Sequence, residues 1–361
     1  MSETSDFLVL GGGIAGAAAS HHLAEHGRVT LLEAEPRPGL HSTALSAGLF
    51  SEYYGNRAVR TLTTASRPFY EEAGLLRPRG VLALAPPGTG SAFEQALRSG
   101  AEAPEGVAEL EPDEALRLCP IVRPGFERAL LRRGACDVDV AGAHRLLLRR
   151  GRVVTDARVT ALSRNGGGWV AETTAGRFTA PVVVNAAGAW ADAIAVLAGV
   201  APQGMVPLRR TAAVVAPPDG HDISGWPMIT DIAGTYYARP EAGGLLLSPA
   251  DAAPMPPGPV HADPADIATA LTRFERATTV PAGPVRRSWA GLRTSTPDDT
   301  PVIGEAAGAP GFFWLAALGG YGVQSAPAAG LLLAHLVTGT TTPPPLSAVT
   351  AALAPDRTAR I

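Results

Sequence analysis

The 361-residue chain contains no lysine, so all 30 residues of its Lys and Arg total are arginine. Without lysine, the protein cannot form a Schiff base with pyridoxal phosphate or with a carbonyl substrate. Cysteine is scarce as well, because Cys119 and Cys136 are the only two and do not form a CxxC pair. We therefore expect two free thiols in a protein that works in a reducing compartment.

The chain also lacks an excess of charge and long apolar runs. Its formal net charge is −3 and its pI is near 6.3, so nothing in its charge favours a nucleic-acid partner. No stretch approaches the roughly 18 uninterrupted apolar residues of a membrane span, and the first residues, MSETSD, have no basic region typical of a signal peptide. We expect a cytoplasmic protein without a membrane span. Its 46% hydrophobic and 17% charged residues suit a globular enzyme of two joined domains.

The N-terminal stretch DFLVLGGGIAGAAASHHLAEHGRVTLLE predicts a dinucleotide-binding βαβ unit. Residues 7–10 form a short apolar run typical of a strand, GGGIAG is a turn, residues 15–26 favour a helix, and residues 28–32 predict a second strand that ends on Glu33. Strand, glycine turn, helix, strand and acid follow in the order of this unit. An ordinary βαβ unit with a glycine-rich turn is the alternative.

Each part of this unit has a physical task. Gly11 permits the tight turn, Gly13 lets the backbone approach a pyrophosphate, and Gly16 lets the helix pack closely on the strand. The N-terminus of the helix presents unpaired N–H groups and the positive end of its dipole to phosphates. Glu33 is placed where a carboxylate accepts hydrogen bonds from ribose hydroxyls.

Two later turns have the same character. NAAGAWAD, at 185–192, follows a predicted strand at 181–184, and LGGYG, at 318–322, lies between a predicted strand at 312–316 and a predicted helix at 323–336. Small residues at the carboxyl end of a strand allow the backbone to contact a ligand. For the first turn, the alternative is a tight strand-to-helix connection with a purely structural role.

The hydroxyl and imidazole side chains near these turns allow more than one functional or structural role. Ser42, Thr43 and Ser46 are short donors and acceptors that could approach a cofactor or cap a local turn. His22 and His26 stand one helical turn apart on the glycine-turn helix, where we expect solvent-facing or capping roles. We predict no metal site.

Hydrophobic periodicity and turn residues predict the other elements. The predicted helices cover 56–73, 92–98, 111–118 and 264–277, and the predicted strands cover 80–85, 152–160, 169–173, 177–180, 206–215 and 235–247.

Taken together, these motifs resemble the D-amino acid oxidase superfamily of FAD enzymes. GGGIAG with Glu33, VVNAAGAWAD at 183–192, WAGLRTSTPDDTPVIG at 289–304 and GGYGVQ at 319–324 occur in the order of that family. Within it, the chain looks most like D-arginine dehydrogenase, at HST (41–43), VRTLTTASR (59–67), NAAGAWADAIA (185–195), TYYARPEAGGLLLSPA (235–250) and GGYGVQ.

The resemblance implies an α/β fold. It combines a glutathione-reductase-type, Rossmann-like FAD-binding domain with a second α+β substrate domain built on an antiparallel sheet. The expected FAD-binding domain is discontinuous and comprises residues 1–80, 140–205 and 288–361. The expected substrate-binding domain comprises residues 81–139 and 206–287.

Carried onto this sequence, the resemblance also assigns cofactor contacts. The turn at 319–324 would place a helix N-terminus near the flavin, where positive potential stabilises the anionic reduced ring. The residues expected to contact FAD are Gly11, Gly13, Ile14, Ala15, Gly16, Glu33, Ala34, Ser42, Thr43, Ser46, Ala47, Gly48, Val159, Ala187, Gly188, Trp190, Arg293, Gly319, Gly320, Tyr321, Gly322, Val323 and Gln324.

For the substrate, Arg293 is the candidate for a bidentate clamp on an α-carboxylate, which suits a planar guanidinium. Arg209 or Arg210 is a candidate second donor to that carboxylate. The alternative for each arginine is a structural ion pair or a stacking contact. The candidate hydroxyls and walls of the pocket are Tyr54, Tyr237 and Tyr321.

Departures from the family pattern refine these expectations. D-arginine dehydrogenases hold the substrate guanidinium with a glutamate in the strand that matches residues 79–82, and this chain has no acid there. A buried cation without a counter-charge is costly, so small or apolar D-amino acids should be better substrates than D-arginine or D-lysine. Sarcosine-oxidase-like relatives attach flavin to a cysteine before their TPD motif; residues 291–295 contain none, which predicts noncovalent FAD.

The expected reaction is FAD-dependent oxidative deamination of a D-amino acid to the 2-oxo acid and ammonia, by hydride transfer to flavin N5. Sarcosine-oxidase-like relatives use a lysine to activate oxygen, so its absence adds modest weight to a quinone-type acceptor over O2. Two alternatives stay open. One is oxidation of glycine, sarcosine, a cyclic amine or a larger amine on the same fold, and the other is a flavin-binding subunit without turnover.

Overall fold

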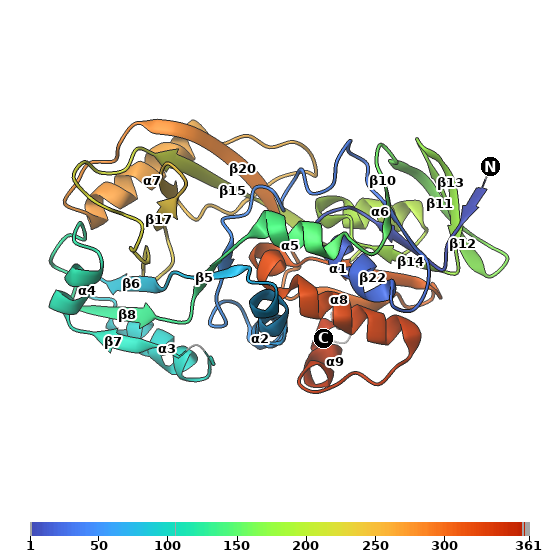
Figure 1. Cartoon of the computed structure of the whole chain (residues 1–361), viewed down its shortest axis with the longest axis horizontal. Helices are drawn as coiled ribbons and strands as arrows, with labels where there is room; N and C mark the ends of the chain where they lie inside the picture. The colour runs from blue at the N-terminus through green and yellow to red at the C-terminus, as the bar shows by residue number, and fades with distance from the viewer. Residues whose placement is uncertain (1, 105, 356, 358–361) are drawn as a thin grey trace.

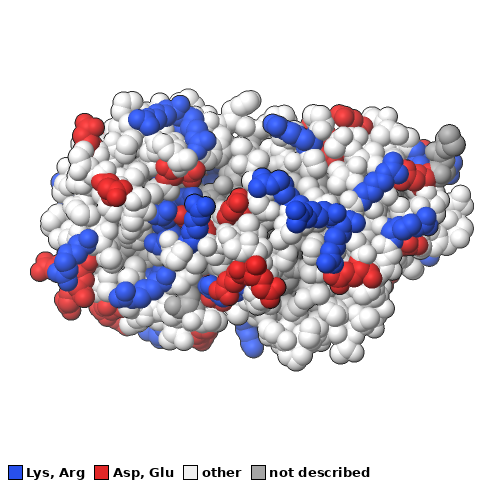
Figure 2. Space-filling model, in the orientation of Figure 1, with Lys and Arg blue, Asp and Glu red and all other residues white. Residues whose placement is uncertain are grey.

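Two large β-sheets, each covered by its own helices, lie along the long axis of the molecule (Figure 1). The structure is a computed structural model that describes residues 2–104, 106–355 and 357. Basic and acidic side chains are interspersed on the face shown in Figure 2, in keeping with the small net charge. Within the described residues, no helix is both long enough and apolar enough to cross a membrane.

The first large sheet has six strands, of which five run parallel and β21 pairs antiparallel with β22. Its central strand β2 is buried on both faces, which explains the uninterrupted run FLVL. In spatial order the strands are β10 (Arg152–Val154), β3 (Val29–Leu32), β2 (Phe7–Leu10), β14 (Val182–Asn185), β22 (Phe312–Ala316) and β21 (Val302–Glu305).

Helices and a small sheet enclose this six-stranded sheet. The helices include α1 (Ile14–Leu23), α2 (Arg57–Glu72), α5 (Val140–Leu147), α6 (Ala191–Leu197) and α8 (Gly322–Thr338). The small sheet contains β1 (Ser2–Thr4), β13 (Gly176–Ala180), β12 (Gly168–Thr173) and β11 (Val159–Asn165). Its Trp169 packs in one core with Phe312 and Trp314 of β22.

The second large sheet has nine strands, whose pairs are antiparallel except for β16 with β6. Its strands are β19 (Ala253–Pro254), β15 (Val206–Val215), β18 (Gly244–Ser248), β17 (Tyr237–Glu241), β16 (Met228–Asp231), β6 (Val81–Ala85), β8 (Arg128–Arg132), β7 (Ala108–Leu110) and β20 (Val285–Ser295). It carries α3 (Gly90–Ala101), α4 (Pro112–Leu118) and α7 (Pro264–Ala277).

Short elements complete the fold. A three-stranded sheet joins β4 (Leu49–Phe50), β9 (Cys136–Val138) and β5 (Leu76–Pro78). The remaining elements are η1 (Gly188–Trp190), η2 (Gly319–Tyr321), η3 (Leu346–Val349) and α9 (Thr350–Leu353). Cys119 and Cys136 are both free and buried.

The fold class predicted from the sequence is confirmed, and so is the capped start of α7, where Asp263 accepts a hydrogen bond from the Ala265 N–H. The single strand predicted at 152–160 is wrong. It is two strands of different sheets, because Asp156, with a φ of +53°, turns the chain between β10 and β11. The sequence analysis also missed β20, which crosses the predicted domain boundary at residue 288; that boundary stays a prediction.

The expectation that His22 faces solvent or caps a helix is also wrong. Its Nε2 atom is buried, and its ring lies 5.0 Å from that of His21. Burial lowers the pKa of His22 to about 4, with a smaller contribution from His21. His26 is exposed, as expected.

Substitution of Gly330 by alanine should test the packing of α8 on α1. A Cβ on Gly330 would lie 2.6 Å from the backbone C and O of Ala18. Helix propensity alone would favour alanine by about 1 kcal/mol, whereas overpacking costs about 1–3 kcal/mol. We expect a lower free energy of unfolding by denaturant, with Gly258→Ala, which has no neighbour within 4 Å, unaffected. A more stable Gly330→Ala protein would contradict this view of the α1–α8 contact.

Candidate functional site

A groove of about 320 Å³ lies at the carboxyl ends of β2, β3, β14 and β22. The ends of neighbouring parallel strands meet at one edge of a sheet, where α/β proteins bind ligands. The predicted cofactor residues that line the groove are Gly11, Gly13, Ile14, Ala15, Glu33, Ala34, Ser42, Thr43, Val159, Ala187, Gly188, Trp190, Gly319 and Gly322.

The glycine turn brings backbone against backbone at one end of the groove. A Cβ on Gly16 would lie only 1.8 Å from the carbonyl oxygen of Gly11, and a Cβ on Gly11 would lie 2.6 Å from that of Ala186. Gly11 also has a φ of +106°, which favours glycine. At Gly13 the nearest atom to a Cβ would be Thr43 Oγ1 at 3.5 Å, so this position has ordinary space around it.

Glu33 and His144 hold the turn from two sides. Glu33 is 8% exposed, and its two carboxylate oxygens accept hydrogen bonds from the N–H groups of Gly12, at 2.7 Å, and Glu35, at 2.9 Å. His144 Nε2 donates to the Gly12 carbonyl at 2.8 Å, and burial lowers the pKa of this imidazole. Each Glu33 oxygen has a second lone pair, so the carboxylate can still accept ligand hydroxyls.

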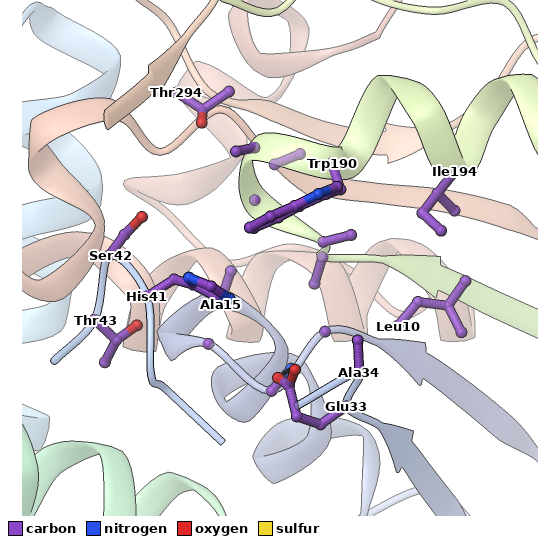
Figure 3. Close-up of a pocket in the computed structure, with 18 of the residues that line it drawn as sticks. Leu10, Ala15, Glu33, Ala34, His41, Ser42, Thr43, Trp190, Ile194 and Thr294 are labelled. Carbon is purple, nitrogen blue, oxygen red and sulfur yellow. Dashed lines mark hydrogen bonds between the residues drawn. The ribbon is translucent and has the colours of Figure 1, made fainter. Parts of the chain in front are cut away.

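Helix α1 points its N-terminus into this groove without a side-chain cap at Gly13. Thr43 Oγ1 accepts the Ile14 N–H at 2.9 Å, and a helix end of this kind attracts anions. Figure 3 shows Trp190 across the pocket from Glu33, with Ser42 and Thr43 along one side. A buried carboxylate for ribose, a helix end for pyrophosphate and an apolar wall that includes Ile194 fit the adenosine diphosphate part of FAD.

A second cavity, of about 80 Å³, continues from the groove. The two share Ile14, Ser42, Thr43, Leu292, Gly319 and Gly322 in their linings. The other predicted site residues that line the second cavity are Ser46, Ala47, Arg210, Tyr237, Arg293, Gly320 and Val323.

Arg293 lines the second cavity. A Cβ on Gly320 would be 2.9 Å from Arg293 Nη1, so the guanidinium rests on the backbone of the second glycine turn. Burial alone would lower the pKa of Arg293, but Tyr237, Tyr54 and Tyr321 outweigh it and raise this pKa. The rings of Tyr54 and Tyr321 lie 4.7 Å apart. The group therefore stays a cation.

Strand alternation separates the two arginines that the sequence could not distinguish. Arg210 pairs with Gly291 on β20, and Leu208 pairs with Arg293, so Arg210 and Arg293 share one face of the sheet. Arg209 points to the other face. There its Nη2 donates to Asp266 Oδ2 at 2.8 Å and to Asp263 Oδ2 at 3.2 Å. The structure thus brings Arg210 into the cavity and leaves Arg209 in an ion-pair cluster, contrary to its candidacy as a carboxylate donor.

Other predicted site residues lie outside both cavity linings. The Tyr321 hydroxyl donates to Asp299 Oδ2 at 2.7 Å. Gln324 Nε2 donates to Ser51 O at 3.2 Å and Thr63 Oγ1 at 2.9 Å, so this side chain joins α8 to α2 instead of reaching the groove. The remaining residues of this kind are Gly16, Gly48 and Tyr54.

The sequence analysis also missed several residues of the site. Leu292 and Thr294 line the groove beside Arg293, and the position of both within WAGLRTST was the available signal. His41 lies next to the chosen hydroxyls, and its ring is 4.8 Å from that of Trp190. In the part of the chain that the structure describes, no group of three or more His, Cys, Asp or Glu side chains could hold a metal ion.

Comparisons with known proteins agree with this geometry. The family model DAO, described as FAD dependent oxidoreductase, matches residues 6–336. Human mitochondrial dimethylglycine dehydrogenase is 27% identical over 274 residues, which cover 68% of this chain but 30% of that protein. The uncharacterized oxidoreductase YurR of Bacillus subtilis is 25% identical over 368 residues, which cover 92% of this chain and 95% of that protein.

Solved structures share the fold over nearly the whole chain. Glycine oxidase from Geobacillus kaustophilus superposes with a TM-score of 0.84 at 23% identity, covering 94% of this chain and 96% of that one. L-Proline dehydrogenase from P. horikoshii gives 0.85 at 21% identity, with 100% and 99% covered. Iminodiacetate oxidase from Chelativorans gives 0.80 at 24% identity, with 95% and 98% covered.

Proposed function

The chain belongs to the DAO family of FAD-dependent oxidoreductases, and from this premise we propose that it oxidises a small or apolar D-amino acid to the 2-oxo acid and ammonia. The observation that carries the proposal is the cavity in which Arg293 and Arg210 face one another beside the cofactor groove. Two partly buried guanidinium groups on one sheet face are suited to an anionic substrate group, and an amino acid has an α-carboxylate.

The two arginines of the cavity bind and orient the substrate in this reaction. The planar guanidinium of Arg293 binds the α-carboxylate through two parallel hydrogen bonds, and Arg210 donates to the same group. This clamp fixes the α-carbon, and the wall of the cavity excludes water. Bound FAD would supply the acceptor for the hydride that leaves the α-carbon. The neutral amine forms the C=N bond as the C–H bond breaks, and water then releases ammonia from the imine.

The walls of the cavity support small or apolar side chains over cationic ones. Ala47 and Ala212 contribute only methyl groups to its lining. Near the strand where D-arginine dehydrogenases place their glutamate, Asp137 is already shared by Arg79, at 2.8 Å, and Arg239, at 2.8 Å. A substrate guanidinium would have to compete with two arginines for this carboxylate. We therefore propose that D-arginine, despite the resemblance of the motifs, is a poor substrate.

Glycine or an N-substituted glycine is the second candidate substrate. The similarity to dimethylglycine dehydrogenase and the methyl-lined cavity favour it. These compounds have the same α-carboxylate, so Arg293 and Arg210 would have the same task. The two candidates differ only in what stands at the α-carbon and at the amine.

The reaction should be visible when the purified yellow protein is mixed without oxygen with D- and L-amino acids, glycine and sarcosine. We expect D-leucine, D-methionine or D-phenylalanine to bleach the flavin absorbance at about 450 nm faster than D-arginine or D-lysine. Admitting air then distinguishes oxygen from a quinone-type acceptor. A higher catalytic efficiency for D-arginine would refute the proposed specificity, and bleaching only by glycine or sarcosine would favour the second candidate.

We also propose that FAD is held without a covalent bond. Residues 291–295 contain no cysteine, and Cys119 and Cys136 lie outside both cavity linings. Acid precipitation should therefore leave a colourless pellet and release all the flavin into the supernatant. Yellow colour that stays with the pellet would contradict this proposal.

The arginines of β15 and β20 provide a matched test of the carboxylate clamp. Arg293→Gln and Arg210→Gln should each raise KM for the amino acid, because truncating a buried, charge-paired donor costs about 2–5 kcal/mol. Arg209→Gln changes the neighbouring residue on the opposite face, so it should lower thermal stability but leave KM unchanged. Steady-state kinetics and thermal melts measure both effects. An equal rise in KM in all three variants would argue against the clamp.

A further inference from the structure

We propose that Asp251 is the specificity-determining residue that restricts this pocket to substrates with one carboxylate. It neutralises Arg210, so that Arg293 alone is left to be neutralised by the ligand. The inference rests on the proposed function, because it names the substrate class of the same site: monocarboxylate amino acids, and not amino acids with an acidic side chain or with two carboxymethyl groups.

Asp251 contacts Arg210 through both its backbone and its charge. Its carbonyl oxygen accepts a hydrogen bond from Arg210 Nε at 2.6 Å, and its Oδ1 lies 3.9 Å from the same nitrogen. The side chain is 9% exposed, and Oδ1 also accepts the Thr211 N–H at 2.7 Å. Ala250, just before it, has a left-handed φ of +53°, a conformation that a packed structure must enforce. The loop thus holds this carboxylate beside Arg210.

The other acids of the cluster are used elsewhere. Asp263 and Asp266, at the start of α7, both accept hydrogen bonds from Arg209 Nη2 on the far face of β15. The Asp251 carboxylate lies between the two arginines, with Oδ2 3.7 Å from Arg209 Nε and Oδ1 3.9 Å from Arg210 Nε. Among the described residues, Asp251 is the one carboxylate that pairs with the cavity arginines.

Arg293 has a different environment. The side chains that raise its pKa against burial are three tyrosines, and none of the described carboxylates forms an ion pair with it. Desolvation and the nearby charge of Arg293 both lower the pKa of Arg210.

The net charge of these side chains determines how many carboxylates the ligand carries. Arg210 and Asp251 cancel, and Arg293 adds one positive charge, so the cavity matches a single carboxylate. A second carboxylate on the ligand would be buried without a free cation to pair with, because Arg210 is already paired with Asp251, and an unpaired buried charge is strongly unfavourable.

Asp251→Asn tests this inference, because the amide oxygen can still accept the Thr211 N–H while the negative charge is lost. The FAD-loaded protein is titrated calorimetrically with acetate and with malonate, which differ by one carboxylate. We expect the ratio of malonate to acetate affinity to rise by roughly tenfold or more in the variant. The matched control is Asp263→Asn, which removes a charge beside Arg209 on the far face, keeps a side-chain oxygen for the Ala265 N–H and should leave the ratio unchanged. With turnover, D-aspartate should gain on D-alanine in kcat/KM by a similar factor.

A double variant separates charge from structure. Arg210→Gln combined with Asp251→Asn removes both members of the neutral pair, so the affinity ratio should return toward that of the unmodified protein even though both affinities fall. A parallel loss of affinity for both probes in Asp251→Asn, with the ratio unchanged, would make Asp251 a structural residue and overturn the inference.

Failure of the proposed function gives a different pattern. If no amino acid reduces the flavin but the malonate ratio still shifts in Asp251→Asn, the amino-acid reaction is refuted while the charge rule stands. If neither acetate nor malonate binds the unmodified protein, the cavity is no carboxylate site and the inference fails.

Discussion

The contact between helix α1 and the turn after β2, at Gly16 and Gly11, is the constraint on which the rest of the site depends. A side chain at Gly16 would overlap the Gly11 carbonyl, so helix α1 can approach β2 only because position 16 is glycine. This approach directs the uncapped N-terminus of α1 into the groove and brings its far side against α8 at Gly330. Helix α8 in turn follows the second glycine turn, on which Arg293 rests. Through these contacts, the packing at Gly16 links the cofactor groove to the second cavity.

The charges of Arg210 and Arg293 impose a second constraint, at the second cavity. Two guanidinium groups are partly buried on one sheet face, with the carboxylate of Asp251 beside Arg210 and three tyrosines near Arg293. The strand that provides Arg210 also carries Arg209, yet the alternation of β15 sends the latter to the acids of α7. Adjacent residues of one strand can thus lie in opposite electrostatic environments, one on each face of the sheet. Adjacent residues on a helix surface could not be separated so sharply.

These two conditions also explain what the sequence could predict. The glycine turn and Glu33 were identified because their tasks depend on a local order of strand, turn, helix and strand. Arg210 could not be chosen over Arg209, because the choice depends on the register with β20, and β20 was not recognised as a strand. Gln324 was assigned to the cofactor from its motif, but the face of α8 on which it lies is set by packing on α2. Asp251 was missed because its partner Arg210 lies 41 positions away in the sequence, and no local pattern links the two.

The position of β20 explains why the chemistry is placed at the junction of the two large sheets. Its paired length belongs to the nine-stranded sheet, while Leu292, in its second half, accepts a hydrogen bond from Ser42 Oγ at 2.5 Å. Trp289 Nε1, in its first half, donates to Leu45 O at 3.1 Å. Residues 42–45, of which Ser42 lines the groove, are thereby fixed to β20, the strand that carries Arg293.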